Sequence, residues 1–362
     1  MTREKTFFLL MAVLLAASHA APSWAQDAPI YTGWHAYGGD AGGTRYSQLE
    51  QITTANVDHL QLAWTYRTGE HAKGSPVAGK LTFEATPIFF DETLYLSTAF
   101  GEVIALEAAN GAERWRFDPQ VDRSRNYSEL ASRGVSLWID TAAASGTACA
   151  ARIFIGTIDA RLFSLDAATG EPCPDFGEDG QVNLAEGYSA DDNPQYVDYQ
   201  VTSPPAVIGD FVVVGSSIGD NWQADTGSGA VRAFDARTGE RKWSWNPLRS
   251  DDRRVGAANA WSVISADPER DLVFVPTGSP SPDFYGGLRP GDNQHANSVV
   301  ALRASTGEVV WAFQTVHHDL WDYDVAAQPA LVTVTHEGQS VPAVAQATKT
   351  GRLFLLHRET GE

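Results

Sequence analysis

The chain has 362 residues, with 45 Asp or Glu against 26 Lys or Arg, so its formal net charge at pH 7 is -19. A charge this negative repels phosphate backbones and anionic lipid, which argues against nucleic acid as a partner. The length allows two or three average domains, but it also suits one large domain built from repeats.

The N-terminus carries the pattern of a secretory signal peptide. Arg3 and Lys5 precede an apolar run over residues 7–17, and residues 23–25 offer a small-residue cleavage site. That run is shorter than the roughly 20 residues of a membrane-spanning helix, and no later stretch is long enough. We therefore expect a signal peptide over 1–25 and a mature chain over 26–362 without a transmembrane segment. In a Gram-negative host it would be periplasmic.

The rest of the chain repeats a short pattern in which a β-type apolar run ends in a glycine turn. The turn glycines are Gly111, Gly170, Gly239, Gly307 and Gly361, spaced 59, 69, 68 and 54 residues apart. Such self-similarity is typical of a β-propeller, in which one small sheet is copied around an axis. The sequence thus predicts an all-β fold with about five blades, and the extra length of each copy is expected in loops that carry sites.

Tryptophans accompany these turns. Trp115, Trp243 and Trp311 each follow a turn glycine by four positions, where an indole could fill the gap between adjacent blades, whereas the second copy has Pro174 there. Residues 62–66 look like the outgoing strand of a blade whose other strands are missing. Because a propeller closes into a ring without open edges, we expect the chain to be an N-terminal fragment of a longer protein.

Two cysteines, Cys149 and Cys173, bracket the strands between residues 152 and 165. In an exported protein an even count favours a disulfide, which for a loop of this length stabilises by roughly 3 kcal/mol. Two separately buried thiols are the alternative.

The densest group of reactive side chains is the run over residues 317–324, with three carboxylates, two imidazoles and two aromatic rings. A carboxylate beside Trp321 suits a general base, because partial desolvation raises its pKa toward working pH. Zinc binding by His317 and His318 is improbable, since neighbours on an extended chain point to opposite faces. An unremarkable acidic surface loop is the alternative.

This run, together with residues 33–40, 44–47, 133–136 and 349–351, closely resembles the pyrroloquinoline quinone (PQQ)-dependent dehydrogenases of the membrane-bound glucose dehydrogenase type. The resemblance implies an eight-bladed propeller, of which five blades fit this chain. It also implies that Asp322 is the catalytic base and that Lys349 hydrogen-bonds the quinone. Without the family, Lys349 reads as a solvated turn lysine.

The resemblance assigns cofactor contacts as well. Trp261 would form one face of the quinone slot, where stacked rings bury a large area, although alone it reads as an inter-blade core residue. Glu84 and Arg133 would contact the cofactor, with Arg133 binding a carboxylate, although either could be a surface ion pair. Thr157 and Ser203 lie at comparable places on inner strands.

The family also holds Ca²⁺ against the quinone through oxygen ligands. Asp220 is the candidate carboxylate ligand, Asp322 a further one, and Ser279 stands where the family usually has Asn. Two other departures concern the second face of the slot. No vicinal cysteine pair lies between residues 122 and 133, and Trp138 stands where we expect the histidine of the glucose dehydrogenase type, so that face could be aromatic.

The implied activity is oxidation of an alcohol, aldose or polyol by hydride transfer to PQQ, with electrons passed on to a quinone or another acceptor. The alternative is a catalytically silent propeller that acts as a protein-binding scaffold. A nicotinamide dehydrogenase would need a strand, glycine-rich turn and helix unit, and the sequence has none.

Overall fold

The computed structural model describes residues 33–73, 78–144, 146–186, 199–219, 226–248 and 256–362. The predicted signal peptide, residues 1–25, lies outside this part of the chain. The described residues form strands and turns with short 3-10 helices, namely η1 (Val57–His59), η2 (Glu70–Lys73), η3 (Ala78–Lys80) and η4 (Gly286–Leu288). Over the same residues, no helix has the length and apolar character needed to cross a membrane.

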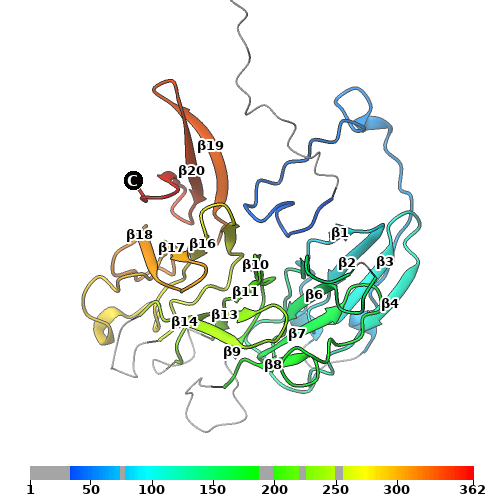
Figure 1. Cartoon of the computed structure of the whole chain (residues 1–362). Helices are drawn as coiled ribbons and strands as arrows, with labels where there is room; N and C mark the ends of the chain where they lie inside the picture. Colours follow the sequence, from blue (N-terminus) through cyan, green and yellow to red (C-terminus); the bar gives the residue numbers. More distant parts are fainter. Residues whose placement is uncertain (1–32, 74–77, 145, 187–198, 220–225, 249–255) are drawn as a thin grey trace, which may run out of the picture.

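The strands make five consecutive antiparallel sheets, which we call blades 1 to 5, and Figure 1 shows them following one another around an arc. Blade 1 consists of β1 (Ile88–Phe90), β2 (Thr93–Ser97), β3 (Val103–Glu107) and β4 (Glu113–Phe117). Blade 2 consists of β5 (Ser136–Ile139), β6 (Ala151–Gly156), β7 (Arg161–Asp166) and β8 (Gln181–Asn183). Blade 3 consists of β10 (Ala206–Ile208), β11 (Phe211–Val214), β13 (Val231–Asp235) and β14 (Arg241–Trp245).

Blade 4 consists of β15 (Ser265–Asp267), β16 (Leu272–Pro276), β17 (Ser298–Arg303) and β18 (Val309–Gln314). Blade 5 has three strands among the described residues, β19 (Ala330–His336), β20 (Gln339–Ala347) and β21 (Leu353–His357). A two-stranded ribbon of β9 (Tyr199–Gln200) and β12 (Ser217–Ile218) lies outside the blades. The predicted all-β fold and the five blades are confirmed.

The core lies between the blades. All five residues of the middle strand β16 are buried, because neighbouring blades cover both faces of such a strand. In the outer strand β14 only Trp243 is buried. The main hydrophobic clusters accordingly span pairs of adjacent blades; one joins Val213 and Val231 of blade 3 to Val273 and Val300 of blade 4.

The tryptophans fill the gaps between adjacent blades, as predicted. A Cβ atom on Gly170 would lie 2.5 Å from the ring of Trp115, whose Nε1 donates to Ala167 O at 3.1 Å. In the same way Trp243 of blade 3 covers Gly307 of blade 4, and Trp311 of blade 4 covers Gly361 of blade 5. The turn glycine of blade 3, Gly239, instead approaches the backbone N of Gly177 and Val182, consistent with the proline in the second copy.

Trp64 makes the same contact at the other end of the arc. Its ring covers Gly111 of blade 1, and its Nε1 donates to Ala108 O at 3.1 Å. Residues 62–66 thus pack against blade 1 without forming a strand, and their role as the outgoing strand of another blade stays a prediction. Leu62 is 83% exposed.

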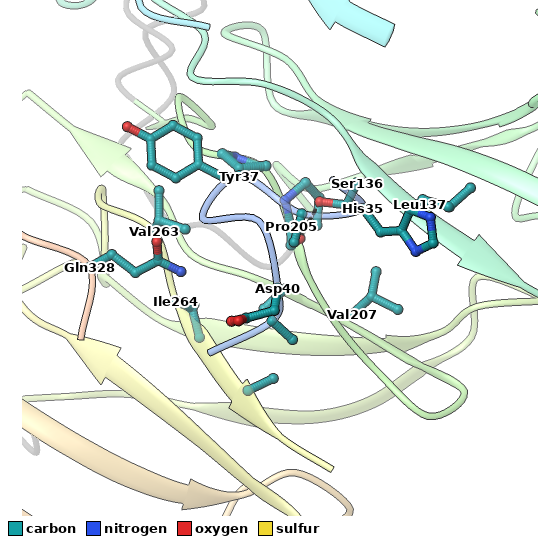
Figure 2. A pocket seen from close by; sticks show the side chains of 15 residues that line it. His35, Tyr37, Asp40, Ser136, Leu137, Pro205, Val207, Val263, Ile264 and Gln328 are labelled. Carbon is teal, nitrogen blue, oxygen red and sulfur yellow. Dashed lines mark hydrogen bonds between the residues drawn. The ribbon is translucent and has the colours of Figure 1, made fainter. Parts of the chain in front are cut away.

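A segment over residues 34–42, which we call the strap, connects blades that are far apart in the sequence. Trp34 pairs with Phe89 of blade 1, Ala41 O accepts Ala266 N of blade 4 at 2.9 Å, and Gly42 O accepts Leu331 N of blade 5 at 2.8 Å. Figure 2 shows the side chains of the strap beside a cavity of about 240 Å³, lined mainly by apolar groups of blades 2 to 4. The strap therefore ties both ends of the arc together.

Candidate functional site

A second cavity, of about 380 Å³, brings together residues from separate blades and loops, and we call it the polar cavity. Its volume lies within the ~300–1,000 Å³ of small-molecule sites. Its lining includes four residues predicted from the sequence, Arg133, Trp261, Asp322 and Lys349. The other lining residues are Ser128, Glu129, Thr202, Ser217, Ile218, Gly219, Asn259 and Asp324.

Lys349 joins two carboxylates at the centre of this lining. Its Nζ lies 3.3 Å from Asp322 Oδ2 and 3.1 Å from Asp324 Oδ2, and it donates to Asp322 O at 2.9 Å. Trp261 Nε1 donates to Asp324 Oδ2 at 3.2 Å. Asp324 thus connects the indole to the lysine, and the three residues predicted to act together are neighbours.

The electrostatics distinguish Asp322 from an ordinary surface acid. Burial, reinforced by the charge of Asp324, raises the pKa of Asp322 to about 6, although Lys349 opposes the shift. Burial alone would lower the pKa of Lys349, but the charges of the two carboxylates outweigh it, so the pKa of Lys349 is raised. At neutral pH the site thus holds an ionised base beside a fixed cation.

Arg133 forms another part of the wall. Its guanidinium pairs with Glu84 Oε2 at 2.9 Å, donates to Thr202 Oγ1 at 2.8 Å and lies over the indole of Trp261, 4.9 Å from the ring centroid. Glu84 itself does not line the polar cavity. The predicted pair is therefore an ion pair at the edge of the site, and only Arg133 reaches its interior.

Two predicted cofactor contacts lie outside the lining. Thr157 is 1% exposed and its hydroxyl is hydrogen-bonded to Asp159, so it cannot reach the cavity. Ser203 Oγ donates to Trp261 O at 2.6 Å, which fixes the backbone that carries the indole.

The predicted metal ligands are only partly brought together. Asp220 lies outside the described residues. The hydroxyl of Ser279 donates to Asp319 Oδ2 at 2.6 Å, away from the polar cavity. Among the described residues no third titratable ligand completes a cluster with Asp322 and Asp324.

The prediction that Trp138 forms the second face of the slot is wrong. Trp138 is 3% exposed and packs with Phe154 and Phe176 between blades 2 and 3, and its Nε1 donates to Gly209 O at 3.0 Å. It fills an inter-blade gap instead.

Sequence reasoning missed several lining residues. Asp324 could have been found, because it alternates with Asp322 along an extended loop and so can share its side. Glu129 had no such signal: its main chain is held by the buried Gln200, whose Oε1 accepts Glu129 N at 2.9 Å and whose Nε2 donates to Glu129 O at 2.8 Å. Burial raises the pKa of Glu129. Asn259 donates through Nδ2 to Ser216 O at 2.6 Å, which leaves its amide oxygen as an acceptor.

The cysteine pair is not part of the lining of the polar cavity. Cys149 and Cys173 form a disulfide with a Cα–Cα distance of 5.9 Å, which joins the loop before β6 to the segment after β7. Asp175 lies close enough to both cysteines to form a cluster of three potential metal ligands with them, and its carboxylate pairs with Arg152 at 2.6 Å. A disulfide does not bind metal through thiolates, so this cluster is structural.

Comparisons with known proteins agree with this geometry. Residues 34–362 match the β-propeller domain family of PQQ glucose, ethanol and alcohol dehydrogenases. The chain is 38% identical to quinoprotein glucose dehydrogenase A of Acinetobacter calcoaceticus and 36% identical to a quinate/shikimate dehydrogenase (quinone) of Acinetobacter baylyi. These alignments cover 94% and 91% of this chain but only 45% and 43% of the relatives, so the chain spans about half of their length.

Solved structures give the same result. The quinohemoprotein alcohol dehydrogenase of Comamonas testosteroni superposes with a TM-score of 0.74 at 29% identity, over 91% of this chain and 48% of that one. A europium-containing methanol dehydrogenase superposes with a TM-score of 0.72 at 26% identity, over 92% of this chain and 58% of that one.

Proposed function

Because the chain belongs to the PQQ-dependent glucose, ethanol and alcohol dehydrogenase family, we propose that it forms the catalytic face of a dehydrogenase acting on CH–OH groups. The observation that carries this proposal is the meeting of Asp322, Lys349 and Trp261 in one cavity, through the contacts of Lys349 and Trp261 with Asp324. Trp261 lies 61 positions before Asp322, and Lys349 lies 27 positions after it. Proximity in the sequence therefore does not explain why the three side chains meet there.

The donor set of the polar cavity fits a flat, anionic quinone. Arg133 and Lys349 supply cationic hydrogen-bond donors for carboxylate or carbonyl oxygens, and Trp261 supplies an aromatic surface. These three residues would hold PQQ, with Thr202 and Asn259 adding polar contacts at the wall. When bound, the quinone supplies an electrophilic carbonyl carbon that accepts a hydride.

In this arrangement Asp322 accepts the proton of the substrate hydroxyl. Its raised pKa, about 6, makes it a stronger base than an ordinary aspartate while leaving it ionised at neutral pH. Lys349 keeps the carboxylate oriented and provides a fixed donor for negative charge that develops beside it.

The charge balance of the cavity supports a divalent cation. Its lining carries three carboxylates, Glu129, Asp322 and Asp324, against the two cations Arg133 and Lys349. An anionic cofactor would add to a net negative charge, so a hard cation such as Ca²⁺ would favour its binding. Asp322, Asp324 and the amide oxygen of Asn259 are the oxygen donors at hand, with Asp220 a predicted further ligand.

The names of the relatives support a proposal for the substrate and the electron acceptor, and the N-terminal sequence supports one for the location. An aldose or polyol is the proposed substrate, because the names of similar proteins specify glucose and quinate or shikimate. The parenthetic "quinone" in one of these names supports a quinone as the electron acceptor. The segment over 1–25 supports a periplasmic location.

The test uses full-length protein loaded with PQQ and Ca²⁺ and a dye-reduction assay on aldoses, polyols and simple alcohols. Asp322→Asn should lower turnover at least about 10³-fold while the cofactor still binds, because the base is lost but the cationic contacts remain. Asp179→Asn, on an exposed turn of blade 2, is the matched control and should keep wild-type turnover. Undiminished turnover in Asp322→Asn, or wild-type protein that binds no PQQ, would contradict the proposal.

A further inference from the structure

One buried carboxylate next to the polar cavity is not used by the proposed chemistry. Asp319 is 1% exposed, and its side chain accepts hydrogen bonds from both sides. Oδ1 accepts Trp321 N at 3.0 Å, and Oδ2 accepts Tyr323 N at 2.7 Å, Ser279 Oγ at 2.6 Å and Asn297 Nδ2 at 3.0 Å. A carboxylate buried this deeply is tolerated because four donors replace its water.

The two main-chain bonds of Asp319 enclose the residue that carries the base. Trp321 N belongs to the peptide group that precedes Trp321, and Tyr323 N belongs to the peptide group that follows Asp322. One carboxylate thus holds backbone N–H groups on both sides of Asp322. Asp322 has a φ of 58°, in the left-handed region that non-glycine residues seldom adopt. Such a conformation persists only where surrounding contacts impose it.

Ser279, on the loop after β16 of blade 4, ties both ends of this loop to the blade. Its hydroxyl bonds to Asp319, and its backbone N–H donates to Asp324 Oδ1 at 2.6 Å. Asn297, just before β17, also donates to Ser279 Oγ at 2.9 Å. The loop over 319–324 is therefore anchored to blade 4 at its first and last residues, with the unusual backbone of Asp322 between the anchors.

We propose that Asp319 is a positioning residue, which imposes the backbone conformation of Asp322 and so directs its carboxylate toward Lys349 and the substrate. The proposal rests on the proposed role of Asp322 as the base. A misplacement of about 1 Å at a reacting group can cost about 10²-fold in rate, so the loss of this anchor should act on turnover. The same argument gives Ser279 the task of orienting Asp319.

Asp319→Asn is the direct test in full-length protein. An asparagine keeps the volume, but one of its two terminal atoms becomes an NH₂ group, so either orientation faces at least one of the four donors with another donor. We expect turnover per PQQ-loaded site to fall about 10–100-fold, with KM and the Kd for PQQ within about twofold of wild type. Loading is measured by titrating tryptophan fluorescence, so that each rate refers to occupied sites.

A second readout needs no cofactor. In full-length protein before PQQ is added, hydrogen exchange of the Trp321 and Tyr323 amides should be at least about 10-fold faster in Asp319→Asn than in wild type. The matched control is Asp267→Asn, which alters a carboxylate 4% exposed in blade 4 that pairs with Arg270 and Arg358. This control should lower stability yet leave turnover per loaded site unchanged.

The outcomes separate the two proposals. Wild-type protein that neither binds PQQ nor turns over would remove the proposed function. An active wild type with unaltered turnover per loaded site and unaltered exchange in Asp319→Asn would overturn only the positioning role. If Asp319→Asn fails to fold, Ser279→Ala removes one of the four donors, and it should lower turnover per site about two- to fivefold with Ca²⁺ affinity retained. Unchanged turnover in that variant, or lost Ca²⁺ affinity, would count against the inference.

Discussion

The packing of tryptophans on turn glycines makes a quantitative prediction about the blade interfaces. Gly170 has a φ of 76°, and a Cβ atom there would lie 2.5 Å from Cε3 and 2.7 Å from Cδ2 of Trp115. Gly209 has a φ of 55° and a Cβ there would meet no atom within 4 Å. Gly170→Ala and Gly209→Ala thus share the backbone penalty and differ in the contact with the indole.

The magnitudes follow from this difference. A left-handed alanine costs about 1–2 kcal/mol, offset in part by the smaller entropy of the unfolded chain, so Gly209→Ala should cost about 1 kcal/mol. Gly170→Ala must also displace the Trp115 ring. The displaced ring loses its hydrogen bond to Ala167 O, which costs about 1 kcal/mol. The added methyl group also overpacks the interface between the blades, which costs about 1–3 kcal/mol. Its total should be about 3–5 kcal/mol.

The assay is equilibrium urea unfolding of full-length protein, followed by tryptophan fluorescence and circular dichroism. Trp115→Leu removes the ring, and in that background Gly170→Ala should cost no more than Gly209→Ala. Equal losses for the two glycine variants in the wild-type background would refute the idea that the indole, rather than backbone conformation, makes glycine necessary.

Three other results are expected. Asp324→Asn weakens the anchor of Trp261 and Lys349 and should raise the Kd for PQQ about 10-fold in a fluorescence titration, and an unchanged Kd would contradict it. The pKa of Asp140 is lowered to about 2 by its hydrogen bonds, first of all to Arg237, so the pair stabilises above about pH 4, and the benefit disappears as the pH falls toward 2. The urea midpoints of wild type and Arg237→Gln should therefore differ at pH 5 and converge near pH 2; a constant difference would exclude this origin. Replacing both cysteines by serine should cost about 3 kcal/mol, and no loss in urea would show that the disulfide leaves the unfolded chain unconstrained.

The polar cavity was predictable in part, and the pattern of success has a physical cause. Asp322 stands in a dense cluster of reactive side chains, whereas Lys349 and Trp261 could be named only through the family resemblance. Trp138 was misassigned because an indole on a strand looks the same in sequence whether it faces a site or an inter-blade gap. Which gap it fills depends on the packing of blades 2 and 3 on each other.

The sequence by itself determined the repeat. Turn glycines with left-handed φ values recur in all five blades, and in three of them a tryptophan follows four positions later, so the repeat is visible in the sequence and reveals the propeller. Only the tertiary structure decided which loops meet. Asp319 accepts the backbone N–H groups of Trp321 and Tyr323, and Ser279 beside blade 4 donates to the same carboxylate. The strap crosses from blade 1 to blades 4 and 5. Contacts of this kind join segments of unrelated spacing, and no periodicity encodes them, because the ring geometry alone brings those segments to one place.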